Sequence, residues 1–155
     1  MLHYKRAGVG RERLRDIYCA MTRSVLEYSS NVYHSQMNNR QNNELERIQK
    51  RCLRLIYGYD KDYKELLELS GLKTLKQRRE EAFSKFANKT AKNPKYGHWF
   101  PLKEKRRHTR GGNTYKEETA VGNRLYNSPI YAMRRLLNNT ESERTIDLSG
   151  IFNEP

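Results

Sequence analysis

Long apolar runs are missing from this sequence, and apolar residues are scarce throughout it. Only 35% of the 155 residues are hydrophobic, and the mean hydropathy is −1.06. No stretch approaches the roughly 20 apolar residues that cross a bilayer, and the opening MLHYKRAGVG lacks the apolar segment of a signal peptide. We therefore expect a soluble intracellular protein, nuclear or cytoplasmic, with a thin core.

Cysteine and histidine are too few and too scattered for the chemistry that they usually support. Cys19 and Cys52 both fall at positions that the apolar pattern predicts to be buried, so we expect reduced packing residues and no disulfide framework. None of the four histidines forms a close pair with another histidine or with a cysteine. The sequence therefore predicts no zinc site, no other metal site and no cofactor.

Positive charge, by contrast, is abundant. The chain carries 31 Lys and Arg against 18 Asp and Glu, which gives a formal net charge of +13. Such a surface attracts polyanions, because each phosphate that a cation neutralises releases counterions. The predicted partner is therefore an RNA or DNA backbone, bound without base specificity. An anionic membrane surface is the weaker alternative, and no membrane partner is predicted.

Apolar residues recur at three- and four-residue steps, a spacing that predicts amphipathic helices. The strongest stripe extends over residues 12–33, and its members are Leu14, Ile17, Tyr18, Met21, Val25, Tyr28 and Val32. A second helix is predicted over residues 44–57, with Asn43 as its N-cap and Gly58 ending it in a left-handed conformation. Its buried face is expected to hold Leu45, Ile48, Cys52, Leu55 and Ile56.

Two patterns typical of capping boxes predict two further helices. Asp62 stands three residues before Glu65, and Thr74 stands three residues before Gln77. The helix that opens at Thr74 is expected to turn four apolar residues inward, namely Leu75, Ala82, Phe83 and Phe86. The predicted fold class is mainly α: a small antiparallel helical bundle with a basic irregular loop and a short C-terminal helix.

The pattern changes at Pro94, which bars continuation of the preceding helix. An aromatic, turn-rich segment follows, and then a mostly polar and basic run without periodicity. Ser128 and Pro129, an N-cap and a first-position proline, open a final helix that is predicted to end near Asn138. The predicted organisation is a thumb-like helical bundle over residues 1–93, an aromatic anchor and basic loop over 94–128, and a short helix and tail over 129–155.

Two groups of basic residues are the predicted nucleic-acid-binding site. One shares a face of the helix over 44–57 and consists of Arg47, Lys50, Arg51 and Arg54. The other follows Trp99 and Phe100 and consists of Lys103, Lys105, Arg106, Arg107 and Arg110. Cations on a helix face hold a phosphate backbone, and a basic run beside aromatics grips RNA or single-stranded DNA through phosphates and stacking.

Each group also has an ordinary explanation. A charged stripe is often only the solvated face of an amphipathic helix. The basic run equally fits a nuclear-localisation patch or a disordered loop. Trp99 and Phe100 are expected to be packing anchors and not platforms for bases, because large aromatic side chains bury most of their area in folded domains.

Two blocks of sequence carry a resemblance to a known family. They are YCAMTRSVLEYSSNVYH at residues 18–34 and LERIQKRCLRLIYG at residues 45–58. In this order and at this spacing they resemble the region after the polymerase core of jockey-like, LINE-type non-LTR retrotransposon reverse transcriptases. Further likenesses fall at residues 63–67, 99–101 and 128–138, so the resemblance covers roughly residues 8–138.

The resemblance implies that the first helices correspond to the thumb and the remainder to the C-terminal extension of such an enzyme. The aromatic-Ala-Asp-Asp sequence that holds the family's catalytic metal ions is absent, so no enzymatic activity is expected. The predicted function is non-sequence-specific binding of template–primer or element RNA beside a fingers–palm core. Two alternatives stay open: a protein-interaction module that docks on that core, and a truncated element remnant without selected activity.

Overall fold

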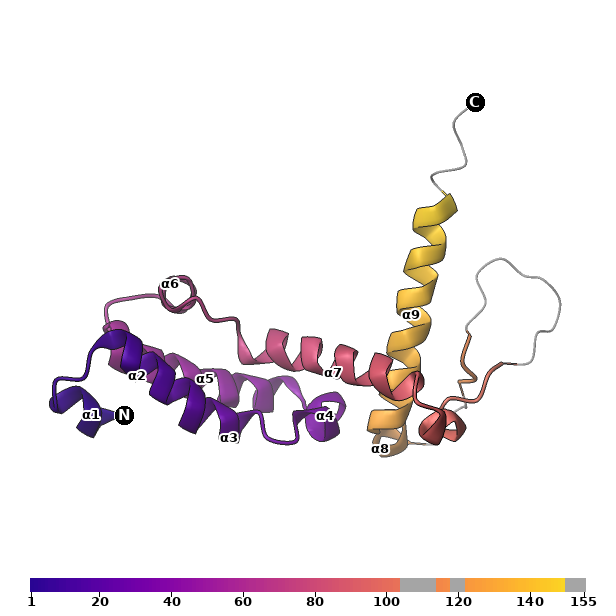
Figure 1. The fold of residues 1–155 in the computed structure, drawn as a ribbon, viewed down its shortest axis with the longest axis horizontal. Coiled ribbons are helices and arrows are strands. Elements are labelled where there is room, and N and C mark those ends of the chain that lie inside the picture. Colours follow the sequence, from indigo (N-terminus) through magenta and orange to yellow (C-terminus); the bar gives the residue numbers. More distant parts are fainter. Residues whose placement is uncertain (104–113, 118–121, 150–155) are drawn as a thin grey trace, which may run out of the picture. The chain divides into compact units, whose positions relative to one another are not determined.

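The computed structural model of the protein describes residues 1–103, 114–117 and 122–149, with side chains up to residue 140 in the last range. Within these ranges the chain is mainly α-helical, which confirms the predicted fold class (Figure 1). An isolated antiparallel bridge pairs Leu102 with Tyr115. The chain forms two compact units: residues 1–30 with 37–81, and residues 31–36 with the described residues from 82 onward. The sequence pattern changes at Pro94, whereas the first unit ends earlier, at Glu81.

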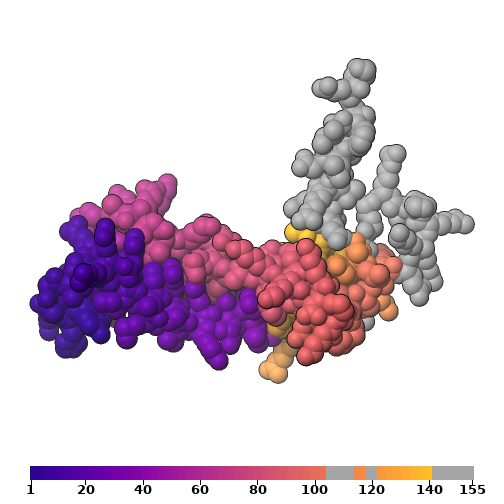
Figure 2. Space-filling model, in the orientation of Figure 1, coloured from indigo at the N-terminus to yellow at the C-terminus, as the bar shows by residue number. Residues whose placement is uncertain are grey.

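Helices make up the first unit. They are α1 (Leu2–Arg6), α2 (Arg11–Ile17), a π-helical segment (Tyr18–Arg23), α3 (Ser24–Leu26), α5 (Asn39–Tyr57), α6 (Tyr63–Ser70) and the start of α7 (Leu75–Ala91). α2 packs along α5, and a core of Leu14, Tyr18 and Ile56 lies between them. α6 packs on α5 as well and stands out as a ridge in the space-filling view (Figure 2).

The helix predicted over residues 12–33 is interrupted. After α2 the backbone becomes π-helical over Tyr18–Arg23, and Ser29, with a φ of 53°, separates α3 from the short α4 (Ser30–Tyr33). A π-helical turn contains more residues than an α-helical turn, so the side chains that follow it point in a different direction from those of a continuous helix. The three- and four-residue spacing that predicts one stripe therefore no longer describes one face.

Burial follows this change of direction. Leu14 and Tyr18 are buried, whereas Met21, Val25 and Tyr28 are 59%, 74% and 79% exposed. The prediction of a buried stripe is correct for its first half and wrong for its second. Val32, the last member of the stripe, belongs to the second unit and is also exposed.

The helix predicted over residues 44–57 begins earlier, at Asn39. Its N-cap is Asn38 and not Asn43: the Asn38 side chain accepts a hydrogen bond from the Gln41 N–H at 2.9 Å, and the Gln41 side chain accepts one from the Asn38 N–H at 3.0 Å. This reciprocal capping box satisfies two donors of the first turn. The helix ends before Gly58 as predicted, although a φ of 124° and a ψ of 158° place Gly58 outside the left-handed helical region.

The buried face of α5 differs from the predicted one. It is formed by Gln49, Leu53 and Ile56, of which only Ile56 was predicted. Leu45, Cys52 and Leu55 are half-buried, and Ile48 is 41% exposed. Successive helix residues are about 100° apart, so the buried face is turned by about one residue from the expected stripe. A fully buried glutamine is possible only if its amide finds hydrogen-bond partners inside the fold.

Gln49 finds those partners on three separate segments. Its Oε1 accepts a hydrogen bond from the Tyr18 hydroxyl at 2.8 Å, and its Nε2 donates to the Tyr63 hydroxyl at 3.0 Å and to the Lys73 carbonyl at 3.1 Å. Tyr63 in turn donates to Glu46, whose other oxygen accepts from the Lys76 N–H at 2.8 Å. These bonds tie α5 to the π-helical segment, to α6 and to the first turn of α7.

The two capping boxes predicted for the next two helices, α6 and α7, are confirmed. Asp62 and Glu65 cap the N-terminus of α6 reciprocally. The Gln77 N–H donates to the Thr74 hydroxyl at 3.1 Å, and the Thr74 N–H donates to the Gln77 side chain at 3.2 Å, which caps α7. Both patterns involve residues three positions apart, so neither depends on the rest of the fold.

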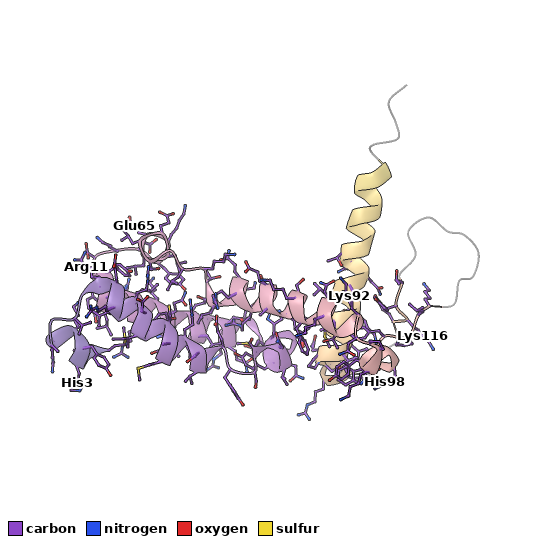
Figure 3. The ribbon with its side chains drawn as sticks, viewed as in Figure 1. His3, Arg11, Glu65, Lys92, His98 and Lys116 are labelled. Carbon is purple, nitrogen blue, oxygen red and sulfur yellow. The ribbon has the colours of Figure 1, made fainter. Side chains whose placement is uncertain are left out.

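The second unit is built around the C-terminal part of α7 and α9 (Pro129–Ser149). Its core consists of Phe83, Ala87, Phe100, Met133 and Leu137, and the half-buried Trp99 packs against this cluster. Phe100 is therefore a packing anchor, as expected, whereas Phe86, predicted to point inward, is 38% exposed. The unit also contains two 3-10 helices (His34–Gln36 and Pro94–Trp99) and α8 (Asn123–Tyr126). Lys92, His98 and Lys116 appear around the end of α7 in Figure 3.

The last helix is longer than predicted. It continues to Ser149 instead of ending near Asn138. Asn138 is 1% exposed and holds the segment of the isolated bridge: its Oδ1 accepts from the Tyr115 N–H at 3.0 Å, and its Nδ2 donates to the Tyr115 carbonyl at 3.2 Å and to Glu117 at 2.7 Å. The polar side chain is thus used for packing and not for capping.

Candidate nucleic-acid interface

The four basic residues predicted on the second helix lie together on α5. Each of Arg47, Lys50, Arg51 and Arg54 has two of the others three or four residues away, a spacing that places side chains next to one another on a helix surface. They line a shallow hollow of about 650 Å³. Glu44, Ile48 and Tyr59 complete its lining. The α5 face, as this surface is called below, lies wholly within the first unit.

The cations of the α5 face lack carboxylate partners. Within the described part of the chain, none of the four forms an ion pair. Glu44, at the edge of the hollow, is engaged by Arg40 at 3.2 Å. An ordinary solvated helix face usually mixes both signs of charge and pairs them. The α5 face is therefore a site of uncompensated positive charge.

Several basic residues elsewhere in the first unit form ion pairs. Arg78 makes two hydrogen bonds to the Glu27 carboxylate, at 2.6 and 3.1 Å, and Lys73 pairs with Glu81. The bond to Glu27 raises the pKa of Arg78 above its ordinary value. These pairs hold helices together and leave little positive charge free for a ligand. Arg11 and Arg13, which line another hollow, also form no ion pair in the described ranges, so the α5 face is distinguished by the gathering of four such cations around one hollow.

Two residues of the α5 face are held in part by the fold. The Lys50 ammonium lies 5.9 Å from the centroid of the Tyr63 ring, within the range of a cation–π contact. The Nε of Arg54 is buried and has no hydrogen-bond partner among the residues that the structure describes. Arg47 and Arg51 are exposed. The face thus combines two oriented cations with two that are free to follow a ligand.

Ile48 and Tyr59 are the members of the site that the sequence pattern does not predict. They are 41% and 63% exposed, although both carry large apolar or aromatic side chains. Ile48 reaches the surface because the buried Gln49 turns the helix. Tyr59 follows Gly58, whose positive φ of 124° ends the helix in a conformation that side-chain-bearing residues rarely adopt. The position of Gly58 after the last helical residue was the available signal for this turn.

The second predicted group is described only at Lys103. This residue is exposed, and its backbone N–H donates to the Thr114 carbonyl at 2.9 Å, beside the bridge between Leu102 and Tyr115. The other members lie outside the described residues: Lys105, Arg106, Arg107 and Arg110. Lys103 belongs to the second unit and α5 to the first, so the two groups are treated as separate candidate sites.

The cysteines and the acidic residues indicate no other site in the described ranges. Cys19 and Cys52 are half-buried free thiols, and burial raises the pKa of Cys52, which lowers the fraction of reactive thiolate. No three His, Cys, Asp or Glu side chains gather there in a way that could hold a metal ion. None of the helices described is both long enough and apolar enough to cross a membrane.

Comparison with known proteins identifies no relative of this chain. Scans against protein-family models, curated proteins and solved structures returned no match. The charge, shape and lining of the α5 face are therefore the observations from which a function can be inferred.

Proposed function

We propose that this chain is a non-enzymatic nucleic-acid-binding segment that holds an RNA or DNA backbone on the α5 face. The carrying observation is the set of four cations around one hollow without carboxylate partners in the described ranges. Such cations bind phosphates because their binding releases counterions from the nucleic acid. Contacts to phosphate position a protein without reading bases, so the proposed binding is not sequence-specific.

The resemblance to LINE-type reverse transcriptases gives this proposal its setting. We propose that the chain derives from the region after the catalytic core of such an enzyme and acts beside a fingers–palm core that supplies the chemistry. The ligand would then be a primed template or the element's own RNA. Support for this setting comes from the two ordered sequence blocks, the second of which contains all four cations of the α5 face.

A salt titration of binding to a primed RNA template tests the proposal. Four phosphate contacts predict that log K falls with log salt at a slope of about −3.6. The double variant R47Q/R51Q should make this slope shallower by about two units. K85Q/K89Q, which removes two exposed lysines from α7, is the matched control and should leave the slope unchanged. Equal changes in both variants, or no binding by folded protein at low salt, would contradict the proposal.

A second candidate function is docking on another protein, and the exposure of Met21, Val25 and Tyr28 favours it. Solvent-exposed apolar side chains that follow one another along a helix and its end are typical of protein-binding surfaces. The proposed partner is the fingers–palm core of a LINE-type reverse transcriptase. These residues are separate from the lining of the α5 face, so both functions are compatible.

Association of this chain with a separately expressed fingers–palm core tests the second candidate. V25D places a charge at one of these exposed apolar positions and should weaken association about tenfold or more. The matched control is L69D, because Leu69 is a 55% exposed apolar residue on α6. Failure of the unmodified chain to associate at micromolar concentration, or an equal effect of both variants, would count against docking through this surface.

A further inference from the structure

We infer that the α5 face binds single-stranded nucleic acid in preference to duplex, with a base stacked on Tyr59 and the adjoining phosphates held by the four cations. This inference rests on the proposed function and specifies its ligand. The juxtaposition behind it is an aromatic ring and an isoleucine side chain placed among unpaired cations in one hollow. A surface that contacts only the phosphates of a duplex needs cations, and these two apolar groups would add nothing to it.

The exposure of Tyr59 is the first step. Its side chain is 63% exposed and, among the described residues, has no aromatic neighbour and no cation above its ring. An exposed tyrosine face offers stacking to any base, because every base has a π-face. Ile48, 41% exposed, adds an apolar surface to the lining of the same hollow.

The arrangement of charge is the second step. From Arg47 to Arg54 the cations extend over about 10 Å of helix axis, and Tyr59 follows just beyond the C-terminal end of the helix. A single strand that follows the cations with its phosphates can turn one base toward the Tyr59 ring. Aromatic side chains beside a positively charged groove are the arrangement by which proteins bind single strands.

A duplex fits the same surface less well. Its bases are stacked inside, and it presents phosphates and sugars to a protein that approaches the backbone. Tyr59 would then find no base face to stack on, and Ile48 would meet sugars and phosphates instead of an apolar surface. A single strand exposes its bases and can use both the cations and the apolar groups. The preference therefore follows from the mixed lining of the hollow and not from its charge.

The test compares affinities of the full chain for a short oligouridylate, a short oligothymidylate and a blunt RNA duplex. Y59A should lower the ratio of single-strand to duplex affinity about tenfold, and Y59F, which keeps the ring, should restore most of it. Y4A is the matched control, because Tyr4 is an exposed tyrosine on α1, outside the hollow. Its ratio should equal that of the unmodified chain.

The outcomes separate this inference from the function on which it rests. If R51Q weakens binding to single strands and Y59A does not, the cations bind nucleic acid and the stacking inference is overturned. If neither variant changes any affinity, both proposals are overturned. A fall in the ratio with both oligouridylate and oligothymidylate supports stacking through the base. A fall with only one of them also supports it and identifies whether RNA or DNA is the strand that the hollow accepts.

Discussion

The quadruple variant R47Q/K50Q/R51Q/R54Q is expected to bind a primed RNA template about 4,000-fold more weakly than the unmodified chain at 0.1 M salt. The magnitude follows from the salt dependence, because four neutralised phosphates make the affinity vary with roughly the 3.6th power of the salt concentration. A tenfold rise in salt, from 0.1 M to 1 M, therefore weakens binding through these contacts about 4,000-fold, and a variant without the contacts loses that affinity already at 0.1 M. Fluorescence anisotropy with a labelled template measures the loss, which should shrink toward unity as salt approaches 1 M.

Folding and net charge are the two controls for this result. Arg47 and Arg51 are exposed and glutamine is a good helix former, so replacing these two should leave thermal unfolding nearly unchanged. Lys50 and Arg54 are half-buried, and the thermal unfolding of the quadruple variant shows whether replacing them leaves the chain folded. A second quadruple variant, K64Q/K85Q/K89Q/K92Q, removes the same charge from exposed lysines outside the α5 face. A similar loss in this control would mean that binding follows net charge alone, and the α5 face would not be the site.

The charged part of the site was predictable because helix geometry decides it. Once residues 44–57 are recognised as helical, the spacing of Arg47, Lys50, Arg51 and Arg54 places them near one another whichever way the helix packs. Their lack of carboxylate partners was not predictable, because it depends on where glutamates of other segments lie. Glu27, for example, pairs with Arg78 from a helix about fifty residues away, and nothing in the local sequence indicates that choice.

The apolar part of the site was not predictable from periodicity. Ile48 fits the apolar stripe of α5 as well as Leu45 or Cys52 does, and the pattern gives no reason to expose it. Gln49 is buried in its place because Tyr18, Tyr63 and Lys73 supply hydrogen bonds from distant segments. The hydrophobic pattern scores a glutamine as solvent-facing and does not register such partners.

The remaining differences have both local and distant causes. Asn38 and Asn43 are equivalent as N-caps in the local sequence, and the reciprocal bond with Gln41 selects the first. The sequence predicts a helix end near Asn138, but this side chain is buried and forms hydrogen bonds with the backbone of Tyr115, a partner outside the local sequence. The caps of α6 and α7 are predicted correctly because a single pair three positions apart stands at each helix start, whereas two asparagines compete at the start of α5.

The buried network around Gln49 gives the second large effect. Q49M is expected to lower the free energy of unfolding by about 3 kcal/mol. Methionine fills a similar volume, but the Tyr18 hydroxyl loses its acceptor and the Lys73 carbonyl loses its donor. Tyr18 is fully buried, so leaving its hydroxyl unpaired costs about 1–3 kcal/mol. Lys73 is an exposed residue, so the loss of its hydrogen bond adds only about 1 kcal/mol. Urea denaturation followed by circular dichroism measures the change, a large part of the stability of a small unit.

A double-mutant cycle separates this network from simple packing. Y18F removes the hydroxyl that Q49M leaves unpaired. The loss in free energy of unfolding in the double variant Y18F/Q49M should therefore be smaller than the sum of the two single losses by about 1 kcal/mol or more. I48A, at the neighbouring exposed position, is the matched control and should combine additively with Y18F. Strict additivity of Y18F with Q49M would mean that the two side chains do not interact. The turn of α5 that exposes Ile48 would then need a cause other than the burial of Gln49.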